Sequence, residues 1–475
     1  MVSEENFAQP QADKRYFLHF GAVNYEAVVY LNGTKLGRHE GGFTAFQFEV
    51  TKLLKAGENK LLVNVNNIRG ENKIPTSMTD WWNYGGITRP VTLVEVSDNF
   101  IQDYFIQLDK GKTSDIKGWV KIDGVQKQQS VTLEIPEIGV KQIVQTDTSG
   151  YAPLSISSKK IQLWSPDNPK LYAVKLTTAT DTVSDKIGFR TIETRGNEIL
   201  LNGKPIFLKG VSIHEEAPFR AGRCYSEADA YTLLNWAKEM GCNYVRLAHY
   251  PHNETMTRLA DQLGLMVWSE IPVYWAVKFE KPEVYALAET QVVENISRDK
   301  NRASIIIWSM ANETPETEPR LDFLKKLLTK TRSEDPTRLT AAALFSKASK
   351  GLQHIEDPLG EFVDVMGCNE YIGWYTLPAE LAPTINWTSK FNKPMTSTNS
   401  PNGSSMCCNP LLAFENKAAA VKRVGSSLRV LTSSFFKKSS LGSVSGVSFA
   451  IYQIIIEARF LSRLIFSTTC VSARA

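Results

Sequence analysis

Short runs in which hydrophobic and polar residues alternate fill the first part of the chain, from about residue 16 to residue 96. The alternation is clear over residues 44–50, and the run at 27–31 leads into an Asn32-Gly33 pair followed by a returning run. A period of two is typical of strands with one buried face, and Asn-Gly between two such strands is a strong hairpin signal. The pattern therefore predicts an antiparallel β-sandwich of the jelly-roll kind.

A second stretch of alternating runs extends from residue 101 to about residue 194. Its predicted strands include residues 131–135 and 172–176, and a turn at 164–169 separates its later strands. The stretch has the size of one immunoglobulin-like β-sandwich, which is the fold that we expect for it.

The pattern changes after Arg195, where continuous apolar runs alternate with amphipathic helical segments. Ser226 is the predicted N-cap of a helix that ends near Met240. Continuous runs rich in β-branched residues are typical of strands buried on both faces, and repeated strand–helix units predict a parallel α/β barrel. The predicted barrel strands are residues 206–210, 244–247, 265–270, 304–307 and 362–367.

The pattern breaks at Met395. The 80 residues after it contain no Trp, His or Asp, and about one residue in five is Ser. They carry nine Lys or Arg and two acids, a balance of +7, so a chain with a total of +4 carries −3 before them. Neither the strand nor the helix pattern of the preceding part continues. We therefore expect an aberrant tail over residues 396–475.

The overall composition is that of a globular protein, with 10% aromatic and 22% charged residues. A net charge of +4 is too small to indicate a nucleic-acid partner. The six cysteines show no metal-ligand spacing, no apolar run is long enough to span a membrane, and no signal peptide is recognisable. We expect no metal, cofactor or membrane partner, and a cytoplasmic location for the sequence as it stands. A lost N-terminal signal would instead imply a periplasmic or secreted protein.

Seven motifs occur along the chain in a fixed order. Together they resemble glycoside hydrolase family 2, the β-glucuronidases and β-galactosidases, over roughly residues 14–395. The motifs are DWWNYGGITRP at residues 80–90, LLNGK at 200–204, GVSIHE at 210–215, RLAHYP at 246–251, EIP at 270–272, WSMANE at 308–313 and NEYIGWY at 369–375. The resemblance implies a sugar-binding jelly roll, an immunoglobulin-like β-sandwich and a (β/α)8 TIM barrel, in that order.

Two departures from the family pattern stand at the ends. The family's jelly roll begins with strands upstream of residue 16, so this domain reads as truncated. After Met395 the family continues into a strand that ends in Ser-Glu-Phe-Gly, whose Glu is the nucleophile, whereas this chain reads TSTNSP. We infer a reading-frame shift near Met395 and an incomplete barrel. The expected domains are 1–98 (truncated jelly roll), 99–194 (immunoglobulin-like sandwich), 195–395 (partial barrel) and 396–475 (tail).

A retaining glycosidase needs two carboxyl groups about 5–5.5 Å apart, one as acid/base and one as nucleophile. Asn312-Glu313 follows the predicted strand at 304–307, which puts this pair at the mouth of the barrel. The resemblance implies that Glu313 is the acid/base and that Asn312 binds the sugar 2-hydroxyl. No nucleophile is found, because Glu370 ends the sixth strand rather than the seventh and Glu415 has no strand context.

The resemblance implies further roles around that pair. Arg246 would hydrogen-bond the nucleophile and keep it ionised, so without a nucleophile we expect Arg246 to be a cation that lacks its partner. Glu270 would either support the site or form a structural ion pair, and the sequence leaves both open. The remaining candidates for binding the sugar are His249, His214, Asp80, Tyr371 and Trp374.

The expected activity is that of a retaining exo-β-glycosidase that cleaves β-glucuronides or β-galactosides. The motifs at residues 80–90 and 369–375 favour glucuronides, but the family's Asn-x-Lys clamp for the glucuronate carboxylate falls in the replaced region. The alternative is a catalytically inactive remnant, a carbohydrate-binding fragment or a pseudogene product, because the nucleophile is missing. A homo-oligomer is expected only by analogy with intact relatives.

Overall fold

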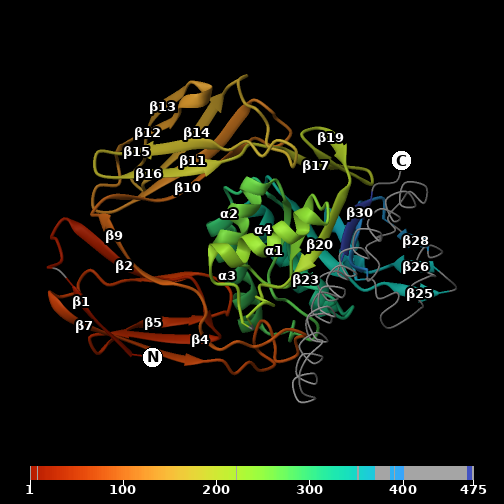
Figure 1. Cartoon of the computed structure of the whole chain (residues 1–475), viewed down its shortest axis with the longest axis horizontal. Coiled ribbons are helices and arrows are strands. Elements are labelled where there is room, and N and C mark those ends of the chain that lie inside the picture. Colours follow the sequence, from red (N-terminus) through yellow and green to blue (C-terminus); the bar gives the residue numbers. More distant parts are fainter. Residues whose placement is uncertain are drawn as a thin grey trace, which may run out of the picture.

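The chain folds into three bodies in sequence order. Figure 1 shows two β-rich bodies, red and orange to yellow, on one side of a strand–helix body, which is green to blue. The last strands of the chain lie on the opposite side of this third body. The computed structural model describes residues 2–7, 9–220, 222–349, 352–369, 386–389, 391–400 and 468–472.

The N-terminal body consists of two antiparallel sheets, with strand orders β1-β7-β4-β5 and β6-β2-β9, and a small β3-β8 pair. Apolar residues of the alternating runs, among them Phe20, Val29 and Val63, form one core. The strands are β1 (Val2–Phe7), β2 (Lys14–Phe20), β3 (Val23–Asn24), β4 (Glu26–Leu31), β5 (Thr34–Glu40), β6 (Phe46–Glu49), β7 (Gly57–Asn66), β8 (Gly86–Ile87) and β9 (Val91–Ser97). The predicted jelly-roll sandwich is confirmed.

The Asn-Gly signal marks the β4–β5 hairpin. Asn32 and Gly33 have φ values of 51° and 83°. Both angles lie in the left-handed region that a two-residue type I′ turn requires, which is why this residue pair suits the position. Strand β1, which pairs with β7, lies upstream of the predicted strands. Its sequence VSEENF is mostly polar, so the hydrophobic pattern does not reveal it.

The second body packs the sheet β10-β11-β14 against the sheet β13-β12-β15-β16. This arrangement confirms the predicted immunoglobulin-like sandwich. Its elements are β10 (Phe100–Leu108), β11 (Asp115–Asp123), β12 (Ser130–Ile135), the 3-10 helix η1 (Pro136–Ile138), β13 (Val140–Gln145), β14 (Tyr151–Ser157), β15 (Tyr172–Thr177) and β16 (Thr182–Ile187). A three-stranded sheet follows, made of β17 (Ile192–Arg195), β18 (Glu198–Leu201) and β19 (Lys204–Ile206).

The third body is a closed sheet with the strand order β20-β21-β22-β23-β24-β27-β29-β30. Its strands are β20 (Leu208–Ile213), β21 (Tyr244–Leu247), β22 (Met266–Glu270), β23 (Ile305–Asn312), β24 (Leu339–Leu344), β27 (Val365–Cys368), β29 (Met395–Ser400) and β30 (Thr468–Ser472). Helices α1 (Glu227–Glu239), α2 (Glu254–Leu263), α3 (Pro282–Asp299) and α4 (Glu318–Glu334) connect the first five strands. The remaining elements are β25 (Lys347–Ser349), β26 (Leu352–Ile355), the 3-10 helix η2 (Pro358–Glu361) and β28 (Asn386–Ser389).

The predicted barrel is confirmed, and all eight residues of β23 are buried, as its continuous apolar run requires. Ser226 caps α1, where its side chain accepts a hydrogen bond from the backbone of Asp229. Strands β20 to β29 run parallel, whereas β30 pairs antiparallel with both β29 and β20. The barrel therefore departs from the (β/α)8 pattern at its last strand, beyond the predicted break at Met395. None of the described helices has the length and apolarity that a membrane span requires.

A buried arginine joins the jelly roll to the barrel. Arg89 donates to the carbonyl oxygens of Phe43 and Pro251, both at 2.6 Å, and to Glu215 Oε2 at 2.9 Å. Arg223 also pairs with Glu215, at 3.2 Å. Burial raises the pKa of the Glu215 carboxyl, whereas the charges of Arg89 and Arg223 lower it. The net effect is a lowered pKa. This ion pair holds the jelly-roll loops against the barrel mouth.

Backbone acceptors join the immunoglobulin-like sandwich to the barrel. Arg190 donates to the carbonyl oxygens of Ala303 and Ile305, and Asn301 exchanges hydrogen bonds with the backbone of Tyr104 and Ile106. These contacts lie at the start of β23, whereas Asn312 lies at the other end of the same strand. The sandwich therefore supports the barrel from the side away from the candidate site.

Candidate active site

The centre of the candidate site is a buried ion pair between Arg246, on β21, and Glu270, at the end of β22. Arg246 Nε lies 3.0 Å from Glu270 Oε2, and Nη2 lies 2.9 Å from Oε1. Trp268 Nε1 donates to the same carboxylate at 2.7 Å, and His249 Nδ1 lies 2.7 Å from it. Our expectation that Arg246 lacks a partner is therefore wrong. Glu270 supplies the partner, and the sequence had left that role open.

The surroundings of Glu270 keep its carboxylate ionised. Burial by itself raises its pKa, but the charge of Arg246 and the hydrogen bonds from His249 and Trp268 outweigh burial and lower the pKa to about 2. The ionised carboxylate balances the buried guanidinium. The buried Arg246–Glu270 ion pair at the mouth of the barrel is therefore neutral as a whole, and its pairing does not depend on any residue of β29.

Asn312 connects this ion pair to the end of β23. Its Oδ1 accepts hydrogen bonds from Arg246 Nη2 at 2.7 Å and from Asn369 Nδ2 at 3.2 Å. These two donors fix which amide atom is the oxygen. Asn312 Nδ2 is buried and has no hydrogen-bond partner among the described residues. A buried donor without an acceptor is costly, so this atom is a natural contact for a ligand oxygen.

Glu313 comes directly after β23 and has a φ of 47°. A non-glycine residue in the left-handed region persists only where its surroundings hold it there, and such residues cluster at functional sites. The backbone N–H of Glu313 donates to the Ala343 carbonyl at 2.9 Å, and Trp275 Nε1 donates to Glu313 Oε2 at 3.1 Å. Glu313 is buried. The left-handed backbone at Glu313 ends the extended run of β23 directly after Asn312, and Trp275 holds the carboxyl there.

A loop of the jelly roll brings aromatic and acidic side chains to the barrel mouth. Trp81 is buried, with its ring centroid 6.0 Å from that of His214, 5.8 Å from that of His249 and 5.0 Å from that of Tyr274. Its neighbour Asp80 is exposed, yet side-chain ligand atoms of Asp80, His214 and His249 all lie within 4.8 Å of one another. The structure thus brings these three predicted site residues together.

His214 is an uncharged imidazole at neutral pH. Burial, and after it the neighbouring His249, lowers the pKa of His214 to about 3. His214 Nδ1 lies 3.4 Å from the Tyr250 hydroxyl, and Tyr250 stacks on Phe43 with a centroid distance of 4.0 Å. Phe43 and Tyr250 were not predicted as site residues. No signal in the sequence placed a jelly-roll phenylalanine beside a barrel tyrosine.

Other predicted site residues fall outside the described part of the chain. These are Tyr371 and Trp374, together with Glu370 and Glu415, the two acids considered as substitute nucleophiles. Asn369, which precedes them, is described: it donates to Asn312 and accepts from Arg246 Nη1 at 3.3 Å. The role of Asn369 was not predicted, although this residue opens the last family motif. Strand β29, with the sequence MTSTNS, carries no carboxylate.

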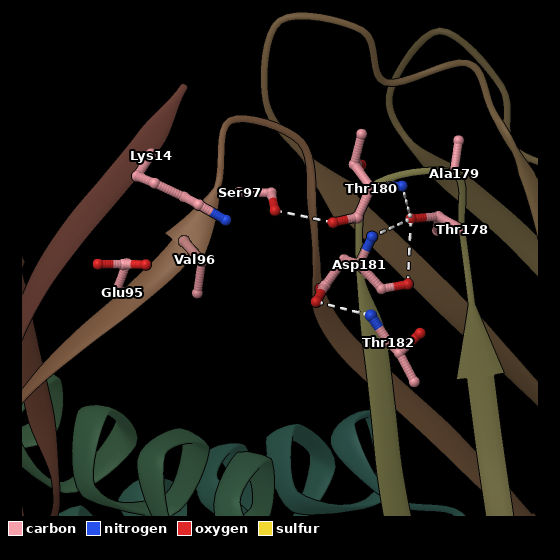
Figure 2. A pocket seen from close by; sticks show the side chains of 9 residues that line it. All are labelled: Lys14, Glu95, Val96, Ser97, Thr178, Ala179, Thr180, Asp181 and Thr182. Carbon is pink, nitrogen blue, oxygen red and sulfur yellow. Dashed lines mark hydrogen bonds between the residues drawn. The ribbon is translucent and has the colours of Figure 1, made fainter. Parts of the chain in front are cut away.

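A separate cavity of about 380 Å³ lies between the jelly roll and the immunoglobulin-like sandwich, away from the barrel mouth. Figure 2 shows Lys14 and Glu95 on one side of it and the turn at residues 178–182 on the other. Ser97 Oγ donates to the Thr180 carbonyl at 2.7 Å across this joint. Its lining includes the carboxylates of Glu95 and Asp181 but no aromatic ring and none of the predicted site residues.

Comparisons with known proteins agree with this architecture. The family description "Glycosyl hydrolases family 2, sugar binding domain" matches residues 4–97, "Glycosyl hydrolases family 2" matches residues 99–190, and "Glycosyl hydrolases family 2, TIM barrel domain" matches residues 192–406. The chain belongs to glycosyl hydrolase family 2.

Individual relatives point to two activities. A putative beta-glucuronidase of Formosa agariphila is 30% identical over 387 residues, which are 77% of this chain and 45% of that protein. The structure of Bacteroides uniformis beta-glucuronidase is 26% identical with a TM-score of 0.70, over 80% of this chain and 50% of that one. A putative beta-galactosidase from Bacteroides fragilis is 28% identical with a TM-score of 0.72, over 81% and 60%. The chain spans less than two thirds of each of these relatives.

Proposed function

We propose that the chain carries the sugar-binding and acid/base part of a retaining β-glycosidase site for β-glucuronides, with Glu313 as the general acid/base. The observation that carries this proposal is the buried, partnerless Asn312 Nδ2 beside Glu313. An amide donor held by Arg246 at this place suits the sugar 2-hydroxyl, a contact that strengthens in the transition state of glycoside cleavage. The names of two of the three relatives support glucuronides rather than galactosides.

The other site residues would bind and orient the sugar. Asp80, His214 and His249 converge on one small volume at the mouth, where they can accept and donate hydrogen bonds to ring hydroxyls. Arg246 and Glu270 act through their neighbours, because they orient Asn312 and His249 rather than face the sugar themselves. Tyr371 and Trp374 remain predictions for the same site.

In the proposed reaction, Glu313 gives its proton to the glycosidic oxygen as the bond between that oxygen and the anomeric carbon breaks. A retaining enzyme then needs a carboxylate on the other face of the sugar to form the glycosyl intermediate. The sequence of β29 offers none. This observation favours a second candidate function, a protein that binds β-glycosides without hydrolysing them, in line with the inactive remnant considered above.

An external nucleophile separates the two candidates. The chain is assayed with 4-nitrophenyl β-glucuronide, β-galactoside and β-glucoside, with and without sodium azide. Azide that attacks the anomeric carbon expels nitrophenolate and gives the α-glycosyl azide, with inversion, without any enzyme nucleophile. We expect the glucuronide to be cleaved with azide. Cleavage without azide would show that another residue acts as the nucleophile.

The role of Glu313 is tested with the leaving group. Glu313→Gln should slow azide-dependent cleavage of an alkyl β-glucuronide about 10²-fold or more and affect the nitrophenyl glucuronide much less, because nitrophenolate leaves without a proton. Equal losses for both substrates would exclude Glu313 as the acid. Binding of a glucuronide in calorimetry without cleavage under any condition would support the binding-only candidate. Cleavage of the galactoside alone would overturn the substrate assignment.

A further inference from the structure

Asp80, His214 and His249 form a group of possible metal ligands that sequence spacing could not reveal. They come from a jelly-roll loop, the end of β20 and the segment after β21, and their ligand atoms lie within 4.8 Å of one another. Two imidazoles and one carboxylate are ligands that transition-metal ions favour, whereas Mg²⁺ and Ca²⁺ prefer oxygen ligands only. The set thus resembles the three protein ligands of an open metal site.

His249 is oriented as a metal ligand would be. Its Nδ1 lies 2.7 Å from Glu270 Oε1, and Glu270 is held in place by Arg246 and Trp268. Because an ionised carboxylate can only accept, Nδ1 carries the hydrogen, and Nε2 keeps a lone pair for a ligand. A histidine that donates its other ring N–H to a carboxylate is the usual arrangement around protein-bound metals.

The group combines fixed and adjustable ligands. Trp81 packs against both histidines, and His249 is buried, so these two rings are held in place. Ligands of a tetrahedral Zn²⁺ lie roughly 3.3 Å apart, given Zn–N distances of about 2.0–2.1 Å. The three ligand atoms lie within 4.8 Å of one another, and Asp80, which is exposed on its loop, is the ligand that can move closest to an ion.

We propose that Asp80, His214 and His249 bind one divalent transition-metal ion of the Zn²⁺ class at the mouth of the barrel. Solvent or a ligand oxygen completes its coordination, because the three residues leave at least one position open. The ion would occupy the volume into which the sugar hydroxyls are proposed to point, so it would act as an inhibitor rather than as a cofactor. This site goes beyond the proposed glycosidase function.

Binding is measured on the whole chain by calorimetry with ZnCl₂ and by the visible absorption of added Co²⁺. We expect one ion per chain, and an affinity that falls about tenfold or more in Asp80→Asn and in His214→Ala. His354→Ala is the matched control, since His354 forms a partly exposed histidine–carboxylate pair with Glu356 at 3.6 Å. This variant should keep the affinity of the natural chain.

Three results would overturn the proposal: no ion bound, unchanged affinity in Asp80→Asn, or an equal loss in His354→Ala. Circular dichroism checks that His214→Ala is folded. If this variant does not fold, the affinity of Asp80→Asn tests the site alone, because Asp80 is exposed and its substitution removes no core packing. None of these measurements requires glycoside turnover. A chain that binds Zn²⁺ here but neither cleaves nor binds glucuronides would refute the proposed function alone.

Discussion

The two sides of the barrel mouth differ in how completely their polar groups are paired. Strands β21 to β23 contribute Arg246, Glu270 and Asn312, which hydrogen-bond one another at 2.7–3.0 Å. On the other side, β27 is followed by the amide of Asn369, and β29 carries no carboxylate. The first side is a paired network, whereas β29, among the described strands of the second side, supplies no carboxylate that could act as a nucleophile.

This contrast shows that folding of the site and turnover have separate requirements. Removing a nucleophile would be expected to leave Arg246 as a buried, unpaired charge, which is strongly destabilising. Here Glu270 accepts from Nε and Nη2, one edge of the guanidinium, and Asn369 accepts from Nη1, so the network closes without β29. The mouth can keep its binding geometry whether or not a second carboxylate is present.

The largest effect should come from giving β29 a carboxylate. Asn399 lies one residue before the carboxyl end of β29, the end of a barrel strand that carries catalytic residues. We expect Asn399→Glu to raise azide-independent cleavage of 4-nitrophenyl β-glucuronide by about 10³-fold or more, since loss of a nucleophile costs at least this much in other enzymes. Asn399→Gln, of equal length but uncharged, should show no gain. Equal rates in both variants would mean that β29 does not face the sugar.

The next largest effect should come from removing the ion pair between Glu270 and Arg246. Glu270→Ala leaves the Arg246 guanidinium buried without its counter-ion, which should lower the free energy of unfolding by about 3–5 kcal/mol in urea denaturation. Glu254→Ala serves as the control, because it removes an exposed pair with Arg258 and should cost less than about 1 kcal/mol. Similar losses of unfolding free energy in both variants would show that other groups compensate the charge of Arg246.

The sequence predicted most of the fold and much of the site, for identifiable reasons. Period-two runs, the Asn32-Gly33 turn and the apolar β23 are local patterns with local physical causes, and they were read correctly. The pairing of Arg246 with Glu270 was missed because it joins two adjacent strands from 24 residues apart, and many partners were available to each charge. The packing of Trp81 against the two histidines depends on how two domains dock, and no periodicity encodes that contact.

The pH dependence of stability tests the Glu270 carboxylate with a smaller expected effect. The pKa of Glu270 is about 2 in the folded chain and about 4.3 when unfolded, so its ionised form stabilises the fold above about pH 4.3 and this contribution is lost as the pH falls through 2. The difference corresponds to roughly 3 kcal/mol. Between pH 5 and pH 2, Glu270→Gln should lose about this much less stability than the natural chain. Parallel curves for the two proteins would place the acid sensitivity elsewhere.

The smallest effect should come from the Nδ2 donor of Asn312, which has no hydrogen-bond partner among the described residues. Asn312→Asp keeps an oxygen for Arg246 Nη2 and Asn369 but removes the Nδ2 donor proposed to face the sugar 2-hydroxyl. One hydrogen bond contributes about 1 kcal/mol, so the affinity for a non-hydrolysable β-thioglucuronide should fall roughly five- to tenfold in calorimetry. The affinity for the 2-deoxy analogue should change much less, and the difference between the two ligands isolates this contact. Asn235→Asp, the same change on exposed α1, should affect neither ligand. Equal losses for both ligands would mean that Asn312 supports the network but does not touch the 2-hydroxyl.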